Sequence, residues 1–195
     1  MKKMKKIYWI LIVIFFTISC SKSKIQEKTE LNKIVNVVLK YESNRNSLKE
    51  NIYLINPELL KLKIYTPSLK EMLGEEPGPP PSFNKSVVRL LDLRHRKSQE
   101  RKSDSLKLLQ QNQYIFDTLK VDDKINPNIK LANKEEINNR IELYQFSNPV
   151  YFNDGFAYIE LKYNDTSFGI GFAYLLEKQK NGEWMVKKML NTFIT

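Results

Sequence analysis

The last fifty residues constrain the fold most strongly, because three clusters of turn-forming residues divide them into four short apolar runs. The clusters are Asn-Asp-Gly at 153–155, Asn-Asp-Thr-Ser at 164–167 and Asn-Gly at 181–182. Asn-Gly is a strong hairpin signal, because a type I′ turn requires positive φ at both central positions. Between the turns, apolar residues alternate in the way that gives a strand one buried face. This segment therefore predicts an antiparallel meander of about four strands.

Prolines limit which segments can join that sheet. Pro149 lies in the first of the four runs and cannot donate a hydrogen bond to a neighbour, so the first strand is predicted to be an edge or to be broken there. A second group of prolines lies at 75–82, which favours extended polyproline conformation and excludes a central strand. We interpret residues 75–82 as a stiff loop.

The segment that follows the first 28 residues has helical spacing. Leu31, Ile34, Val35 and Val38 fall at i, i+3, i+4 and i+7, which places them on one stripe of a helix. Helices therefore come first and strands last, which is typical of the α+β class. The predicted architecture is a single α+β domain over 29–195, with N-terminal helices packed on the C-terminal antiparallel meander.

Residues 89–107 hold the densest group of basic side chains, mixed with acids. A helix is predicted over 98–116, with Leu106 and Leu109 on its apolar face. No aromatic residue interleaves the basic stretch, so nucleic-acid bases have no stacking platform there and we expect no nucleic-acid partner. The stretch is either a solvated helix face or a patch that faces lipid phosphates or anionic glycans.

The N-terminus has the pattern of an export signal. Four lysines within residues 1–6 precede an apolar run at 7–18, which is shorter than the roughly 20 residues that a membrane-spanning helix needs. The run ends in Thr-Ile-Ser-Cys at 17–20, which resembles a bacterial lipobox except that Thr17 stands where Leu is usual. The resemblance implies a lipoprotein signal peptide at 1–19, cleavage and acylation at Cys20, and a lipidated tether at 20–28. An uncleaved membrane anchor is the alternative.

The predicted export and lipidation limit the chemistry that the mature protein can perform. Cys20 is the single cysteine, so lipidation would leave no disulfide and no free thiol. Cleavage would also remove the four N-terminal lysines and lower the formal net charge from +10 to +6. We expect a membrane-anchored lipoprotein of the bacterial envelope, held to the membrane through Cys20, at the outer membrane facing the periplasm. Display on the cell surface is the other possibility.

The C-terminal half is similar to a group of small uncharacterised lipoproteins from Gram-negative bacteria. The similarity is carried by four short motifs: Ser-Asn-Pro-Val at 147–150, Asp-Gly-Phe-Ala-Tyr at 154–158, Gly-Ile-Gly at 169–171 and Asn-Gly-Glu-Trp at 181–184. Members of that group often carry cysteines beside the glycine pair, whereas this chain has none there. The resemblance implies an envelope lipoprotein and supplies no catalytic residue.

Candidate site residues in the sheet have structural explanations as well as functional ones. Gly169 and Gly171 lack the third glycine and the following helix of a nucleotide loop, so they indicate either a helix packed closely on the sheet or a ligand groove. His95 is the single histidine, which excludes a two-histidine metal site. Asp154 and Glu160 are the acids considered for hydrolysis, although acids in turns are usually structural.

The sequence therefore predicts a binding module in preference to an enzyme. The predicted surface lies on the exposed side of the sheet and comprises Phe156, Tyr158, Glu160, Gly169 and Gly171. Its ligand would be an envelope protein or a glycan, which includes inhibitor and immunity roles. No catalytic residue, cofactor or metal is predicted. The alternative is a periplasmic hydrolase that acts on cell-wall or lipid material through Asp154 or Glu160.

Overall fold

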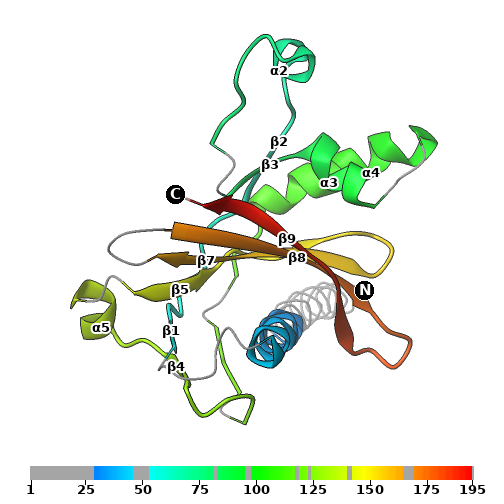
Figure 1. Ribbon diagram of the computed structural model, residues 1–195. Coiled ribbons are helices and arrows are strands. Elements are labelled where there is room, and N and C mark those ends of the chain that lie inside the picture. The colour runs from blue at the N-terminus through cyan, green and yellow to red at the C-terminus, as the bar shows by residue number, and fades with distance from the viewer. Residues whose placement is uncertain are drawn as a thin grey trace, which may run out of the picture.

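The computed structural model describes residues 29–45, 53–80, 83–94, 98–116, 119–122, 124–139, 142–164 and 169–194. The chain has an α+β fold, as predicted, with a large and mostly antiparallel sheet in its C-terminal part (Figure 1). Residues 29–44 form the first described helix. The later elements are β1 (Tyr53–Ile55), β2 (Lys63–Tyr65), α2 (Leu69–Leu73), β3 (Asn84–Ser86), α3 (Val87–Leu93), α4 (Ser98–Gln110), the 3-10 helix η1 (Gln111–Gln113), β4 (Ile129–Leu131), α5 (Lys134–Asn139), β5 (Leu143–Phe146), β6 (Val150–Tyr151), β7 (Phe156–Asn164), β8 (Gly169–Lys178) and β9 (Trp184–Ile194).

The main sheet is wider than the meander predicted from the sequence. Its strand order is β4-β1-β5-β7-β8-β9, with β6 also paired to β7. The β7, β8 and β9 strands are antiparallel, whereas β1 runs parallel to both β4 and β5. The β5 and β6 strands are separated at residues 147–149, so the first run is broken at Pro149 as expected. Gly155 and Gly182 take positive φ at 78° and 84° in the turns that the sequence predicted.

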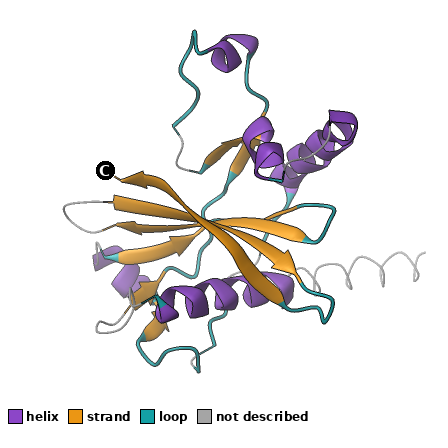
Figure 2. Cartoon of the chain, turned by 45° about the vertical axis from the view of Figure 1, so that its right-hand side comes forward, coloured by secondary structure: helices purple, strands orange, loops and turns teal. Residues whose placement is uncertain are grey.

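One face of the sheet packs against helix 29–44. The stripe residues Leu31, Ile34, Val35 and Val38 are each 0% exposed. They belong to one buried cluster with residues of β1, β5, β7, β8 and β9. Figure 2 shows this helix lying along one side of the sheet, opposite α3 and α4. Burial of an apolar stripe on this scale is the main source of stability for such a helix.

The opposite face is covered by α3, α4 and the small parallel sheet formed by β2 and β3. A second buried cluster joins these elements to the main sheet through Tyr158 and Ala173. The α4 helix contributes Leu108, which is 2% exposed, whereas Leu106 is 57% exposed. Leu109 is partly buried against this cluster, so the predicted apolar face of α4 holds for Leu109 and is wrong for Leu106.

An arm that carries α2 projects from the body of the molecule (Figure 1). The Ser68 hydroxyl accepts a hydrogen bond from the Glu71 amide and caps the helix, which ends at Gly74 with φ of 77°. None of the residues of α2 is buried. The described part of the proline-rich segment, through Pro80, is exposed and contains no strand.

Candidate functional site

The residues of the predicted binding surface do not form an exposed surface. Tyr158 and Glu160, both on β7, are each only 2% exposed, because the α3, α4 and β3 layer covers them. Gly169 and Gly171 on β8 are also buried, and Phe156 is half-buried. The prediction that this side of the sheet faces solvent was therefore wrong. Alternation within a strand identifies two faces, but it does not show whether a second layer covers the more polar one.

Glu160 is the centre of a closed polar network. Its Oε1 atom accepts a hydrogen bond from the Tyr158 hydroxyl at 2.5 Å and forms an ion pair with Lys85 Nζ at 2.7 Å. Its Oε2 atom accepts from the Phe83 amide at 3.3 Å, and Phe83 takes an uncommon positive φ of 58°. Burial, followed by the negative charge of Glu160 and the hydrogen bond to it, raises the pKa of Tyr158. The carboxylate ties β3 to β7 and does not face a pocket for a substrate.

Asp154 is also engaged in a structural contact. Its Oδ2 atom lies 2.6 Å from Arg94 Nη2, and the Arg94 guanidinium stacks 3.2 Å from the centre of the Phe156 ring. This cation–π and ion-pair contact attaches the end of α3 to the turn before β7. The acids of the hydrolase alternative thus lie in separate structural contacts, one at a turn and one in the interior.

The glycine at position 171 makes room for an aromatic ring of the neighbouring strand. A Cβ atom at Gly171 would collide with the side chains of Phe193 and Thr192 on β9. Gly171 is paired directly with Phe193 in the sheet, and Lys162 Nζ lies 5.6 Å from the centre of that ring. Neither predicted explanation, a packed helix or a ligand groove, describes this space, because a strand side chain fills it.

An open groove of about 700 Å³ lies elsewhere, between helix 29–44 and the start of β9. The helix supplies one side of it through residues at helical spacing, and the β8–β9 turn with the first residues of β9 supplies the other. The lining residues are Lys33, Asn36, Val37, Lys40, Tyr41 and Asn44 from the helix, and Asn181, Gly182, Glu183, Trp184, Met185 and Val186 from the hairpin.

The groove combines apolar and polar groups. Val37, Tyr41 and Val186 are partly buried and pack on the first core, and Met185 is 43% exposed. Side-chain amides and lysine ammonium groups stand beside these apolar groups. Such a mixture is typical of ligand sites, in which apolar contact gives affinity and a few polar groups give orientation.

One end of the groove is anchored by Glu30. Its Oε2 atom accepts hydrogen bonds from Trp184 Nε1 and from Lys178 Nζ, each at 2.8 Å. Burial alone would raise the pKa of Glu30, but the hydrogen bonds from Lys178 and Trp184 and the charges of Lys178 and Lys33 together lower it. The charged carboxylate therefore holds the start of the helix against β8 and β9.

The helical spacing of the sequence includes the groove residues, but nothing in that spacing marks them as a site. The helical residues at 33, 36, 37, 40, 41 and 44 form a second stripe beside the buried one. Its mixed composition is that of an ordinary helix flank, so helical spacing alone did not distinguish it. What makes it a site is the open space that it forms with the β8–β9 turn and the first residues of β9.

Several predicted features lie outside the described residues. These are Cys20 with the whole signal peptide and tether, His95, and the turn residues 165–167. Among the residues that the structure describes, no three His, Cys, Asp or Glu side chains come together as a metal site would require. None of the described helices has both the length and the apolar character needed to cross a bilayer.

Comparisons with models of protein families, with curated proteins and with solved structures find no match for this chain.

Proposed function

We propose that this protein is a lipid-anchored module of the bacterial envelope that binds a protein or glycan ligand in the groove between helix 29–44 and β9. The role is that of a binding protein and not of an enzyme. The observation that carries the proposal is the groove itself, in which aromatic, aliphatic, amide and ammonium groups converge on about 700 Å³ of open space.

The proposal treats residues 29–195 as one α+β module in which N-terminal helices back the C-terminal meander. Support for this comes from the first buried cluster, in which Ile34 and Val38 of the helix join Ile159 of β7 and Leu176 of β8. A groove whose walls come from opposite ends of the chain requires both ends to fold together. The ligand site would therefore be lost if either wall were removed.

The proposed cellular location is inferred from the N-terminal sequence. A basic segment, an apolar run and Cys20 in a lipobox-like context favour acylation and outer-membrane anchoring on the periplasmic side. Two or more acyl chains hold a protein stably at a membrane, whereas one gives marginal binding. The tether at 20–28 would then place the groove near the membrane surface.

Binding by the groove is tested with a pair of lysine variants. Lys40 is exposed and lines the groove from the helix, and Lys130 is exposed on β4 away from it, so Lys40→Glu and Lys130→Glu place the same charge reversal at two exposed sites. We expect Lys40→Glu to reduce saturable binding of solubilised envelope proteins or of an immobilised glycan set at least tenfold, and Lys130→Glu to leave it unchanged. Equal binding by both variants and the parent protein would contradict the proposal.

The anchor is tested separately by metabolic labelling with radioactive palmitate. We expect label in the parent protein and none in a Cys20→Ser variant, which should also accumulate with its signal peptide intact. Labelling that persists in Cys20→Ser would contradict acylation at this position.

A further inference from the structure

The β9 strand is the last described strand of the main sheet, and this position gives it an outer edge. It runs from Trp184 to Ile194, and the strand order ends at β9 with β8 as its partner. No other described strand pairs with it. An open edge presents unpaired backbone amide and carbonyl groups, which a further extended segment can use for hydrogen bonds.

Helix 29–44 borders the groove beside the first residues of β9. Its buried stripe packs under the sheet, while its second stripe, which includes Val37 and Tyr41, lines the groove beside Trp184 and Val186 of β9. The groove lies along the first residues of β9, from Trp184 to Val186, so side chains of a segment added at that part of the edge would lie beside the helix.

The β9 strand also restricts which segment can pair with it. Leu175 pairs with Lys188 and Leu176 with Val186, so Lys187 is an additional residue that forms a bulge. Lysines and bulges on an edge strand prevent indiscriminate pairing between sheets. A partner for this edge must accommodate the bulge and compensate the lysine charges.

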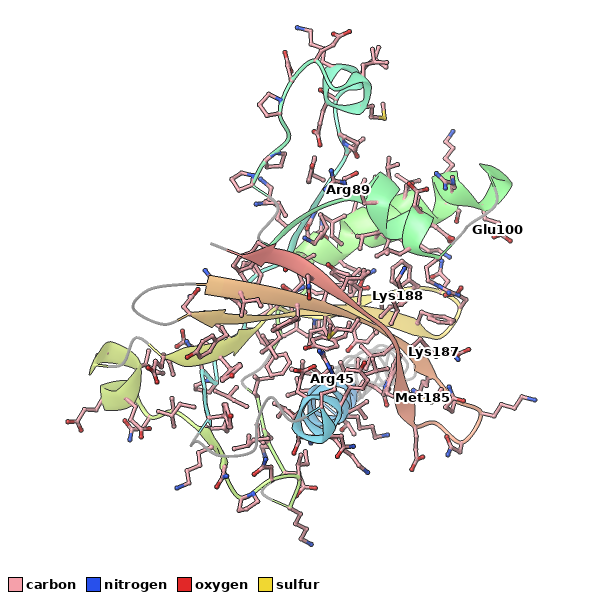
Figure 3. The ribbon with its side chains drawn as sticks, in the orientation of Figure 1. Arg45, Arg89, Glu100, Met185, Lys187 and Lys188 are labelled. Carbon is pink, nitrogen blue, oxygen red and sulfur yellow. The ribbon has the colours of Figure 1, made fainter. Side chains whose placement is uncertain are left out.

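The two faces of β9 differ in character. Val186 and Met189 pack on the core beneath the sheet, on the side of helix 29–44. Lys187 Nζ pairs with Glu177 Oε2 at 2.8 Å, and Glu177 adjoins Leu176, whose side chain points to the helix face. Alternation along a strand therefore places Glu177 and Lys187 on the opposite face. Figure 3 shows Lys187, Lys188 and Met185 along β9.

From this geometry we propose that the ligand of the groove is an extended polypeptide segment that adds to the edge of β9, with apolar side chains over helix 29–44 and acidic side chains toward Lys187 and Lys188. This inference rests on the proposed binding function and specifies its ligand. The backbone of the partner supplies the pairing, and the alternation of apolar and acidic residues supplies the specificity.

A second copy of this chain fits the edge poorly. Antiparallel pairing of β9 with β9 about its lysines would bring Lys188 of both copies together, and β9 contains no acid, while Glu177 on β8 pairs with Lys187 of its own copy. Like charges facing each other across strands are destabilising. We therefore expect the protein alone to show no self-association through this edge.

The probe for the test is a capped ten-residue peptide of alternating valine and glutamate, measured by fluorescence anisotropy on the full chain in detergent. We expect saturable binding, together with slower amide hydrogen exchange over residues 184–190. Alternate amides of a strand point to opposite edges, so one of two analogues, N-methylated on the valines or on the glutamates, should bind at least tenfold more weakly while the other binds normally.

Charge specificity is tested by matched lysine variants. Replacing Lys187 and Lys188 with Gln should weaken peptide binding about tenfold, which corresponds to about 1.4 kcal/mol. Replacing Lys130 on β4 and Lys134 on α5, at the other end of the sheet, with Gln should leave it unchanged. Circular dichroism would verify that both double variants are folded.

Other outcomes overturn the inference. They are absence of peptide binding, equal binding of both methylated analogues, binding of a sulfated oligosaccharide at the affinity of the peptide, and concentration-dependent dimers that bury β9. If one of these occurs while Lys40→Glu still weakens capture of an envelope ligand at least tenfold, the proposed function stands and the strand-addition inference fails. If Lys40→Glu has no effect either, both fail.

Discussion

The two faces of the main sheet are closed by different chemistry. The face under helix 29–44 is mainly apolar, because Leu31, Ile34 and Val38 meet apolar strand residues. The buried Glu42 pairs with Arg45, three residues further along, at 3.1 Å, and Glu30 makes its hydrogen bonds to β8 and β9 at the rim. The face under α3 and α4 carries polar side chains through its interior, among them Glu160 with its partners Lys85 and Tyr158. An apolar interface specifies contact without fixing a register, whereas a polar one is satisfied only in one arrangement.

On the polar face, side-chain amides make the kind of backbone hydrogen bonds that a neighbouring strand would make. The Tyr151 amide donates to Gln111 Oε1, and Gln111 Nε2 donates to the Tyr151 carbonyl, both at 2.7 Å. Asn112 makes the same reciprocal pair with the backbone of Ile64, at 2.9 and 2.7 Å. Two consecutive residues after α4 therefore attach β6 and β2 to the same point. On the side of helix 29–44, Asn32 and Asn36 accept single hydrogen bonds from the backbone amides of Lys120 and Asp122, at 2.8 and 3.2 Å, and the open groove lies on that side.

The largest expected loss of unfolding free energy comes from replacing the buried Glu160. Glu160→Leu removes the carboxylate that pairs with Lys85, whose side chain is 12% exposed. Removing one member of a buried ion pair costs about 3–5 kcal/mol, because the remaining charge keeps its desolvation cost and loses this attraction. Urea unfolding should show this loss. The double variant Glu160→Leu with Lys85→Met should recover most of it, and a double variant as unstable as the single one would contradict the network.

The apolar face is tested by Ile34→Ala. Ile34 is 0% exposed, and truncation of such a residue to Ala costs about 2–5 kcal/mol through lost burial and the cavity left behind. Leu90→Ala, also at a residue that is 0% exposed, provides the matched change on the α3 side. We expect similar losses of unfolding free energy for both. A negligible loss for Ile34→Ala alone would mean that helix 29–44 does not contribute to the cooperative core.

A smaller effect is expected from removing the reciprocal hydrogen bonds between the Gln111 side chain and the Tyr151 backbone. Gln111→Leu keeps the side-chain size but removes the two hydrogen bonds that the Tyr151 amide and carbonyl make with Gln111, which should cost about 1–3 kcal/mol. Hydrogen exchange at the Tyr151 amide should accelerate more than exchange at amides of β8. Gln113→Leu, two residues further on at an exposed position of η1, is the control and should leave both measurements unchanged.

The hairpins were predictable because their information is local. The Asn-Asp-Gly and Asn-Gly clusters specify turns within a few residues, and the turn glycines at 155 and 182 do take positive φ. The broken first strand followed from the missing donor of Pro149 in the same way. The α+β class followed from the order of helical and strand patterns along the chain.

The remaining features depend on residues far apart in the sequence. The β1 and β4 strands have three residues each, too few for a recognisable period, and they join the sheet by parallel pairing between distant segments. Glu160 was interpreted as outward-facing because its strand alternates, yet Lys85 and Phe83 arrive from 75 or more residues away and bury it. The groove was missed for the same reason, since its walls lie at opposite ends of the chain.

The smallest expected effect is at the rim, where Glu30 connects the apolar face to the groove. Because its pKa is lowered in the folded protein from the ordinary 4.5, its contribution to stability is complete above that value and is lost as the pH falls through the folded pKa. Glu30→Gln should therefore destabilise the protein by about 1 kcal/mol at pH 7 and by progressively less below pH 4.5. Urea unfolding at a series of pH values measures this difference, with Glu58→Gln at an exposed loop position as the control. A difference between parent and Glu30→Gln that stays constant with pH would show that the carboxylate acts through shape alone, and the rim would then not be an electrostatic contact.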